Sequence, residues 1–442
     1  MKNIGLLCIV ILYLYGTAYA ERTVWYVHPD SALNSIQAGL DSCADNDIVL
    51  VGPGTYYENI VWPGTQGIHL TSEFGPEQTI IDGDTAGRVI TIACGVDSTT
   101  IIREFTIQNG YHTEFGSGIY CDSSSPTITD NTIRWNATGW YMDPTYGGGI
   151  CCKASSPIIR HNIITENYAT TSGAGIHCDS SSSPIITSNT IIGNTLAAFP
   201  PYGAGGGISC VFSSLTISNN TISDNWPEGI HCKSPSSSSI ISGNIIADNL
   251  RYGIGFTGVG SPSVIHNIIT GNEFAGIHCW NGSSPTIDSC TISSNIGDGV
   301  WCRFGGCPTI HYCNICDNEN YGIRNSDTVL INAEYNWWGH ATGPYHPAAN
   351  PGGLGDSVYG FIDFDPWLSW PLGVKEQVID ISIERKANVG ATIFCGPLQL
   401  PTDKKYKVYD ITGRVVNQDR IQAGVYFIEV DNMILRKVVK VR

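Results

Sequence analysis

Short apolar stretches alternate with polar residues along most of the chain and recur at a regular spacing. In residues 175–194, GIHCDSSSSPIITSNTIIGN, the apolar residues Ile176, Cys178, Ile186 and Ile191 are separated by Ser, Pro, Gly and Asn. β-Branched runs of this length, broken by turn-forming residues, predict short strands joined by tight turns. Each unit of this kind predicts three short strands.

The unit occurs nine times, and a Gly-Ile or Gly-Val pair marks each occurrence. The usual step is about 23 residues, with three enlarged units early in the series. Strands this short bury a core only when successive units stack ~4.8 Å apart, which predicts a parallel β-helix of three-strand coils. The apolar anchor residues of the nine units are Ile119, Ile150, Ile176, Ile208, Ile230, Ile254, Ile277, Val300 and Ile323.

Two columns of asparagine support this register. Asparagine tolerates positive φ, and its amide bonds turn backbone or a stacked amide on the next coil. A proline column, from Pro126 to Pro308, opens the middle strand, where a missing N–H is tolerated. The first asparagine column is Asn131, Asn162, Asn189, Asn220, Asn244, Asn267 and Asn336. The second is Asn136, Asn167, Asn194, Asn225, Asn249, Asn272, Asn295 and Asn318.

On these repeats, the chain from about Trp25 to Leu368 resembles the right-handed parallel β-helix (pectin lyase-like) superfamily. That superfamily includes pectate lyases, polygalacturonases and non-enzymatic surface proteins. Ser35–Ile60 is similar to its N-terminal cap, in which SIQAGL would form a short helix over the open core. Tyr335–Leu368 is similar to its C-terminal closing segment. Solenoids need such caps to cover their terminal coils.

The C-terminal segment has a different pattern. Tyr406–Arg442 alternates apolar and polar residues, which predicts a small antiparallel β-sandwich. The stretches VYDITGR (408–414) and GVYF (424–427) resemble the sorting domain of type IX secretion substrates. That resemblance implies a bacterial protein that the type IX machinery exports and whose sorting domain is then removed. The alternative is a small structural appendage.

The N-terminal segment predicts export. Lys2, a short apolar run and Ala18-Tyr19-Ala20 form a signal-peptide pattern, and no later segment resembles a transmembrane helix. We therefore expect a secreted or cell-surface monomer. The expected domains are a signal peptide at 1–20, a β-helix at 21–371, a linker at 372–379 and a sorting domain at 380–442.

Charge narrows the range of partners. The net charge is −16, and residues from Val374 onward carry 12 Lys+Arg and 8 Asp+Glu, or +4, so the remainder carries −20. This acidity argues against nucleic acid, which needs a basic surface. A polyuronate would also need bridging cations, so Ca²⁺ is expected only for such a ligand. No other cofactor or metal is indicated.

The cysteines belong to the repeat. Seven of them lie two residues after an anchor, so they point into the core with it and act as small apolar side chains. Cys290 and Cys313 instead replace asparagine on adjacent coils, at a spacing compatible with a disulfide. The seven are Cys121, Cys152, Cys178, Cys210, Cys232, Cys279 and Cys302.

Residues directly after each anchor point outward, which selects candidate functional side chains. The histidines among them lie two coils apart or more, at least ~9.5 Å between backbones, so a three-histidine metal site is not expected. Asp122, Lys153 and Asp179 stack on consecutive coils with His177 beside Asp179, and they are the candidates for acid–base catalysis. The alternative is a salt-bridge ladder of small energetic value.

The enlarged coils carry aromatic loops beside the same face. Aromatic rings stack on the apolar faces of sugars, so these loops are candidates for glycan binding. The alternative is that they pack over the sheet and cover it. The candidate binding residues are Tyr120, Trp140, Tyr141, Tyr146, Phe199, Tyr202, Trp226, His231, His278 and Trp301.

The sequence lacks the polygalacturonase signatures of Asp-Asp, Gly-His-Gly and Arg-Ile-Lys, and no lyase-like set of Arg/Lys with a calcium site is evident. We therefore expect a protein that binds a polysaccharide or cell-surface glycan through an exposed sheet face and aromatic loops. Whether it is an enzyme stays open at this stage. The alternatives are a polysaccharide lyase or glycoside hydrolase and a non-catalytic structural adhesin.

Overall fold

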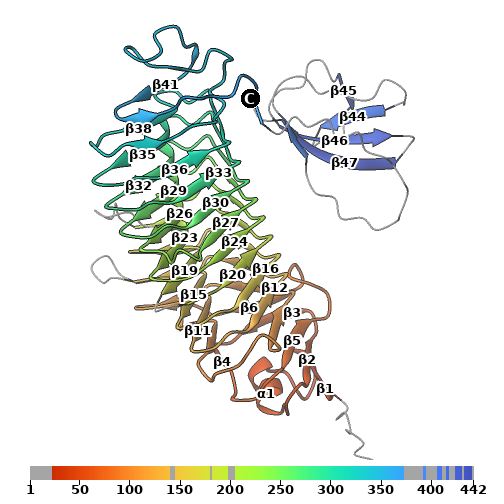
Figure 1. Ribbon diagram of the computed structural model, residues 1–442. Coiled ribbons are helices and arrows are strands. Elements are labelled where there is room, and N and C mark those ends of the chain that lie inside the picture. The colour runs from red at the N-terminus through yellow and green to blue at the C-terminus, as the bar shows by residue number, and fades with distance from the viewer. Residues whose placement is uncertain are drawn as a thin grey trace, which may run out of the picture.

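The computed structural model describes residues 22–139, 145–179, 182–197 and 205–372. Towards the C-terminus it describes 392–394, 406–410, 415–417, 424–430 and 433–440. Residues 22–372 form a parallel β-helix, as predicted, in which each regular coil contributes one strand to each of three long sheets (Figure 1). The predicted signal peptide lies outside the described residues, and the domain boundaries stay predictions.

The first long sheet has 14 strands. Neighbouring strands pair in parallel and in register, so residues of successive units form straight columns. Its strands, in spatial order, are β1 (Val24–Val27), β2 (Ile48–Val51), β5 (His69–Ser72), β8 (Ile101–Arg103), β12 (Thr127–Thr129), β16 (Ile158–Arg160), β20 (Ile185–Thr187), β24 (Thr216–Ser218), β27 (Ile240–Ser242), β30 (Ser263–Ile265), β33 (Thr286–Asp288), β36 (Thr309–His311), β39 (Ile331–Asn332) and β42 (Ile362–Asp363).

The second long sheet has 11 strands, and a four-stranded sheet accompanies it in the enlarged coils. The 11 strands are β3 (Gly54–Tyr57), β6 (Thr79–Asp82), β9 (Thr106–Gln108), β13 (Thr132–Arg134), β17 (Ile163–Thr165), β21 (Thr190–Ile192), β25 (Thr221–Ser223), β28 (Ile245–Ala247), β31 (Ile268–Thr270), β34 (Thr291–Ser293) and β37 (Asn314–Cys316). The four short strands are β10 (Tyr111–His112), β14 (Ala137–Thr138), β18 (Tyr168–Ala169) and β22 (Thr195–Leu196).

The third long sheet has 13 strands and contains the anchor residues. Its outward face carries most of the candidate functional side chains. In spatial order the strands are β4 (Ile60–Val61), β7 (Ile90–Ile92), β11 (Ile119–Asp122), β15 (Ile150–Lys153), β19 (Ile176–Asp179), β23 (Gly205–Val211), β26 (Glu228–Lys233), β29 (Tyr252–Thr257), β32 (Ala275–Trp280), β35 (Asp298–Arg303), β38 (Ile323–Asn325), β41 (Gly355–Tyr359) and β40 (Pro344–Tyr345).

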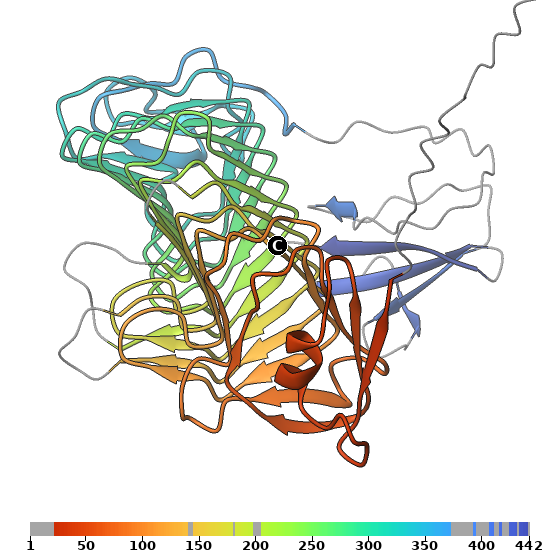
Figure 2. The same cartoon turned by 90° about the horizontal axis from the view of Figure 1, so that it is seen from below.

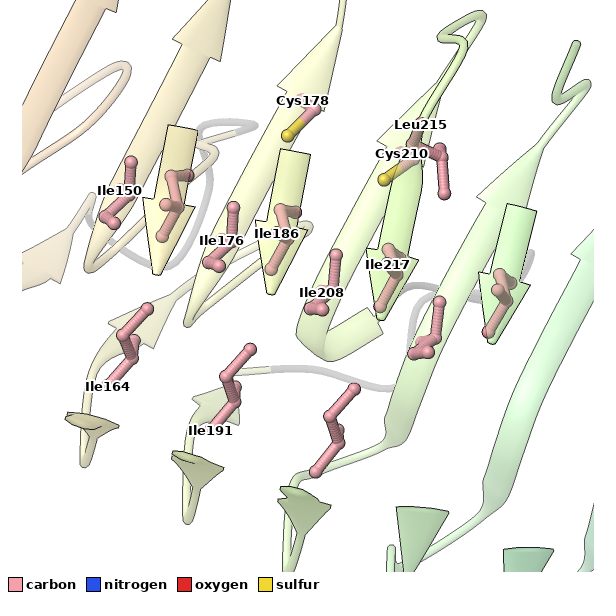
Figure 3. Packing of buried hydrophobic residues seen from close by; sticks show 14 of the residues in the cluster. Ile150, Ile164, Ile176, Cys178, Ile186, Ile191, Ile208, Cys210, Leu215 and Ile217 are labelled. Carbon is pink, nitrogen blue, oxygen red and sulfur yellow. The ribbon is translucent and has the colours of Figure 1, made fainter. Parts of the chain in front are cut away.

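The core consists of columns of Ile and Cys that stack from coil to coil. The anchors Ile150, Ile176 and Ile208 follow one another along one column, with Cys178 and Cys210 in the next (Figure 3). All seven predicted core cysteines are buried, which confirms their inward direction. Cys290 and Cys313 are free thiols, so the predicted disulfide is absent. Each sulfur instead faces a backbone carbonyl of its own turn, 3.3 Å from Asp288 O and 3.2 Å from His311 O.

The second asparagine column forms a continuous amide ladder. Asn136 Nδ2 donates to Asn167 Oδ1 at 3.0 Å, and the same bond recurs on each coil as far as Asn318. Asn318 Nδ2 then donates to a carboxylate oxygen of Asp356 at 2.9 Å. Each amide satisfies buried polar groups that would otherwise cost free energy.

This ladder explains why glycine precedes each anchor. A Cβ on Gly175 would lie 2.5 Å from Gly207 O and 3.2 Å from the side-chain amide of Asn194. The Gly-Ile pair therefore reflects the close approach of the strand backbone to the ladder.

Both ends of the core are covered, as the resemblance predicted. The helix α1 (Ile36–Asp41) lies across the N-terminal end and buries Ile36 and Leu40 in the core (Figure 2). Ser35 caps it, and the Glu58 carboxylate accepts hydrogen bonds from Ile36 N and Gln37 N at 2.8 and 2.9 Å. At the other end, β41 and β42 add to the sheets and Trp338 is fully buried.

The C-terminal segment forms a separate, mainly antiparallel five-stranded sheet. The predicted small antiparallel unit is therefore present, and its described residues form a single layer. Its strands are β43 (Thr392–Phe394), β44 (Tyr406–Asp410), β45 (Val415–Val416), β46 (Gly424–Val430) and β47 (Met433–Lys440). In the described residues, no helix is long and apolar enough to cross a membrane.

Candidate functional site

The outward row that follows the anchors is largely buried, which corrects the expectation of an exposed face. Tyr120, His177, His231 and His278 are 7, 2, 3 and 5% exposed. The cause is local: aromatic side chains at or shortly before the start of a strand lie over the row. Tyr146 places its ring 4.8 Å from that of His177, and Tyr252 stacks on His278 at 4.3 Å.

The predicted catalytic residues come together on β11, β15 and β19. Asp122, Lys153 and Asp179 are in-register neighbours, as predicted. Lys153 Nζ lies 3.6 Å from Asp122 Oδ2, which also accepts a 3.0 Å hydrogen bond from the Tyr120 hydroxyl. Both side chains of the ion pair are partly exposed. Burial, reinforced by this hydrogen bond, raises the pKa of Tyr120 far above its ordinary value.

His177 is less suited to proton transfer with solvent. Its Nε2 lies 3.9 Å from Asp179 Oδ2, too far for a hydrogen bond, and its Nδ1 has no hydrogen-bond partner in the described part of the chain. Tyr146 covers the ring, and Phe115 stacks on Tyr146 at 5.4 Å. The structure therefore places His177 beside Asp179 but beneath a layer of aromatic rings.

The aromatic loops are described only in part. Trp140, Tyr141, Phe199 and Tyr202 lie outside the described residues, and their predicted role stays a prediction. Trp226 is half-buried at the end of its loop, where its backbone N donates to Asn194 O at 3.0 Å.

A second group lies further along the sheet, on β32, β35 and β38 and the turn after β35. We call Trp280, Trp301, Arg303, Phe304 and Arg324 the Trp–Arg patch. The Arg303 guanidinium lies 4.4 Å from the ring of Trp301 and 5.6 Å from that of Phe304. The Arg324 guanidinium lies 5.3 Å from the centre of the same Trp301 ring. These distances are those of cation–π contacts.

Phe304 has an unusual backbone conformation for its type. It is 66% exposed and adopts φ 53° in a turn position that suits Gly or Asn. Neither core burial nor turn geometry explains a phenylalanine here. Its ring instead enlarges the exposed aromatic surface beside Trp280, at a centroid distance of 6.2 Å.

His278 lies beneath this patch and supports it. Its Nε2 accepts a 3.2 Å hydrogen bond from Arg303 Nε, while Trp301 lies 5.1 Å from its ring. Burial, followed by the charge of Arg303, holds the pKa of His278 well below its ordinary value. A neutral imidazole can therefore accept the arginine N–H and fix its direction.

His231 belongs to a third group, whose other members, Glu228, Thr257 and Arg251, were not predicted from the sequence. Its Nδ1 lies 2.7 Å from Glu228 Oε2, and its Nε2 lies 2.8 Å from Thr257 Oγ1. Arg251 lies 3.7 Å from the other Glu228 oxygen. The available signal was an acidic residue two places before the anchor, where other coils have Ser117, Gly148, Ala174, Gly206 and Ala275.

Asp298 occupies the same position in a later coil. It is buried, with Arg324 at 3.9 Å, and burial raises its pKa to about 6 against the opposing charge of Arg324. Among the residues that the structure describes, no three His, Cys, Asp or Glu side chains gather in a way suited to a metal ion.

Comparison with known proteins agrees with this architecture. A family model described as "Right handed beta helix region" matches residues 43–191 and 117–289, which together span more than half of the chain. The chain belongs to this right-handed β-helix family. No curated protein matches it.

Several solved structures are similar to this chain at low identity and low TM-score. The A-module of mannuronan C-5 epimerase AlgE6 from Azotobacter vinelandii is 14% identical, with 76% of this chain and 94% of that chain covered and a TM-score of 0.40. The Dettilon tailspike protein is 16% identical, with 76% and 68% covered and a TM-score of 0.46. An alginate lyase from Paenibacillus is 12% identical, with 77% and 99% covered and a TM-score of 0.37. At these values the comparison does not bear on function.

The basic residues of this β-helix are unevenly distributed. Between residues 21 and 373 the chain has ten Lys and Arg residues, and six lie on or directly before strands of the 13-stranded sheet. The six are Arg88, Lys153, Lys233, Arg251, Arg303 and Arg324. The same strands also carry Asp122, Asp179, Glu228, Asp298 and Asp356, and Lys153, Arg251 and Arg324 each lie within 4 Å of one of these carboxylates. Arg303 is the basic residue that lies beside the rings of Trp280, Trp301 and Phe304.

Proposed function

We propose that the protein binds a polysaccharide along its 13-stranded sheet, with the Trp–Arg patch as the main contact. The observation that carries the proposal is the partly exposed cluster of Trp280, Trp301 and Phe304 around Arg303. Aromatic rings offer apolar faces to sugar C–H groups, and arginine offers several N–H donors to hydroxyl or carboxylate oxygens. Successive coils repeat ~4.8 Å apart, which suits an extended chain lying along the stack.

The position of Arg303 beside the three aromatic rings of the patch favours a polysaccharide that carries acidic groups. Arginine and carboxylate form charge-assisted, bidentate hydrogen bonds, which are stronger than neutral ones. The acidic remainder of the body would repel such a ligand from the other faces. Binding should therefore weaken as salt concentration rises.

The test is a binding measurement with a panel of neutral and acidic polysaccharides, by affinity electrophoresis and calorimetry. Trp301→Ala should weaken binding by on the order of tenfold, since an aromatic contact contributes about 1 kcal/mol or more. Trp135→Ala is the matched control, because Trp135 is 47% exposed on the 11-stranded side with Arg134 at 4.1 Å from its ring. Equal losses in the two variants, or no binding to any member of the panel, would contradict the proposal.

Cleavage of the bound chain is a second candidate, favoured by the arrangement of Asp122, Lys153 and Asp179. The two aspartates lie on the same face two coils apart, ~9.5 Å between backbones, and two carboxylates on one face are the groups that glycosidases use. Chromatography of a polysaccharide incubated with the protein would reveal shortening. Asp122→Asn and Asp179→Asn should each abolish it, and an unchanged chain length with wild-type protein would leave binding as the function.

We also propose that the protein is exported and that its C-terminal sheet is a type IX sorting domain. The signal-peptide pattern and the sequence stretches on β44 and β46 support this. Mass spectrometry of the protein recovered from the medium or cell surface should find Glu21 at the N-terminus and no residues beyond about 380. A full-length protein retained inside the cell would contradict it.

A further inference from the structure

Outside the Trp–Arg patch, one group of side chains on the 13-stranded sheet has an arrangement suited to catalysis. It consists of Glu228 and His231 on β26 and Thr257 on β29. The carboxylate meets one imidazole nitrogen and the hydroxyl meets the other, at 2.7 and 2.8 Å. A hydroxyl within hydrogen-bond reach of an imidazole, which a carboxylate orients from its opposite nitrogen, is the geometry of an activated nucleophile.

The surrounding fold makes room for this arrangement. Gly255 is the in-register neighbour of His231, and it is the one position in the outward row from Tyr120 to Arg324 without a side chain. A Cβ there would lie 2.5 Å from Glu228 Oε2 and 3.0 Å from His231 Nδ1. The absence of a side chain at Gly255 therefore leaves the space in which the Glu228 carboxylate contacts the His231 ring.

The group is rigid and largely dry. Glu228, His231 and Thr257 are 1, 3 and 6% exposed. Arg251, at 3.7 Å from Glu228 Oε1, provides positive charge for the carboxylate. A polar network of this kind, buried with both imidazole nitrogens bonded, holds its side chains in fixed positions.

Thr257 also lies next to solvent-facing positions. Its in-register neighbours are Lys233 on β26, which is exposed, and Trp280 on β32, which belongs to the Trp–Arg patch. Thr257 itself is 6% exposed and lies between this cation and this aromatic residue along the sheet. The positive charge of Lys233 is suited to a developing oxyanion on an acyl group bound at Thr257.

We propose that Thr257, His231 and Glu228 form an acyl-transfer centre that hydrolyses carboxylic esters of small acyl groups, such as acetyl esters of an alcohol or a glycan hydroxyl. This inference does not depend on polysaccharide binding. His231 Nε2 takes the proton of Thr257 as Oγ1 bonds to the acyl carbon. The bond from that carbon to the alkoxy oxygen then breaks, and the His231 proton passes to the leaving alcohol.

Water completes the reaction. It attacks the acyl carbon while His231 Nε2 takes its proton, and the bond to Thr257 Oγ1 breaks as the proton returns to that oxygen. The sum is ester plus water to alcohol plus carboxylic acid, with no oxidant or further co-reactant. Glu228 is a positioning residue, which fixes the Nδ1–H tautomer of His231.

The experiment uses the full chain and p-nitrophenyl acetate. Release of nitrophenolate should exceed the buffer rate, and His231→Gln should reduce kcat by about 10²–10⁴-fold, the usual contribution of a general base. Thr257→Val should remove the activity, while Thr257→Ser should keep it. Thr291→Val, on the 11-stranded sheet, is the control and should match wild type.

Two further measurements separate catalysis from structure. Mass spectrometry of acid-quenched reactions should find an acetyl group on the peptide that contains Thr257, a result that needs no folded variant. Glu228→Gln should lower kcat with KM unchanged, and Glu228→Asp should restore part of kcat. Turnover at wild-type rate in Thr257→Val, or no turnover above buffer together with no acetyl group on Thr257, would overturn the proposal.

Discussion

The outward faces of the 13-stranded and 11-stranded sheets are built on the same coils, yet they carry different chemistry. From β17 to β37, the outward positions of the 11-stranded sheet hold no charged residue: they are Ile163, Thr165, Thr190, Ile192, Thr221, Ser223, Ile245, Ala247, Ile268, Thr270, Thr291, Ser293, Asn314 and Cys316. Over nearly the same coils, the 13-stranded sheet carries Lys153, His177, His231, Arg303 and Trp301. Inward, both sheets present a column of isoleucine, to which the 13-stranded sheet adds a column of mainly cysteine. The core thus requires apolar residues at the inward positions, whereas the outward positions vary.

The largest expected effect tests the equivalence of the two interiors. Ile176→Ala, in the 13-stranded sheet, and Ile191→Ala, in the 11-stranded sheet, each create a cavity in a fully buried column and should each cost about 2–5 kcal/mol. Ile163→Ala, at an outward position that is 47% exposed, should change stability by about 0.5 kcal/mol or less. Urea unfolding followed by circular dichroism measures all three.

A large difference between the two buried variants would break the comparison. It would mean that one sheet, rather than the coil as a whole, determines stability.

The next effect concerns the asparagine ladder between the two sheets. Asn194 accepts hydrogen bonds from Asn167 N and Nδ2 at 3.1 and 3.0 Å and donates to Ile164 O at 2.9 Å. Asn194→Ala would leave these buried groups unsatisfied, at a cost of about 1–3 kcal/mol. In the first column, Cys290 interrupts the ladder, since Asn267 Nδ2 lies 3.9 Å from its sulfur.

The double substitution Cys290→Asn with Cys313→Asn should therefore raise the urea midpoint, because it restores amide bonds between Asn267 and Asn336. A lower midpoint would show that the two thiols fit their positions better than amides do.

The smallest effect depends on pH and lies at the end of the second ladder. Burial raises the pKa of Asp356 to about 6 from 3.8. Because the folded carboxyl binds its proton more tightly than the unfolded one, the stabilisation is complete below about pH 4 and is lost as pH rises through about 6. Thermal unfolding between about pH 4 and pH 7.5 should show this decline.

Asp356→Asn should remove that component, since a neutral amide oxygen can accept from Asn318 at every pH. Asp327→Asn is the control for an exposed aspartate whose pKa is lowered by hydrogen bonds from Gly305 N and Thr328 N. An unchanged pH profile in Asp356→Asn would assign the dependence to other groups.

The sequence predicted the interior of the molecule well, because every stacked coil needs the same kind of residue at each inward and turn position. The anchors, the cysteine column and both asparagine columns follow from period and direction. The in-register stacking of Asp122, Lys153 and Asp179 was predicted for the same reason. The α1 cap and the C-terminal closing segment were predicted from the resemblance to the β-helix family.

The site was harder to predict, because it depends on residues whose types differ from those at the same position in most other coils. Glu228 is the first residue of β26 and Arg251 directly precedes β29, where period-two alternation is not a reliable guide, and their side chains lie beside His231 and each other. Neighbouring side chains bury His177, His231 and His278, which alternation alone had placed at the surface. Phe304 was missed because its turn column holds mostly Ser, Ala, Gly and Asn, and the one other phenylalanine in it, Phe212, was not considered either.

The head-to-tail direction of the asparagine ladder gives the molecule a chemical polarity along its axis. Each side-chain amide donates to the amide oxygen of the next coil towards the C-terminus, so the last amide needs an acceptor beyond the ladder, whereas the first, Asn136, accepts from the backbone N–H of Gly110. Asp356 ends the series as an acceptor that needs no partner of its own. Since each coil presents the same donor and acceptor, a whole coil can be removed or duplicated without changing this terminal contact. Length is thus a variable that the fold leaves open, and a longer or shorter sheet face can be produced by a change of coil number alone.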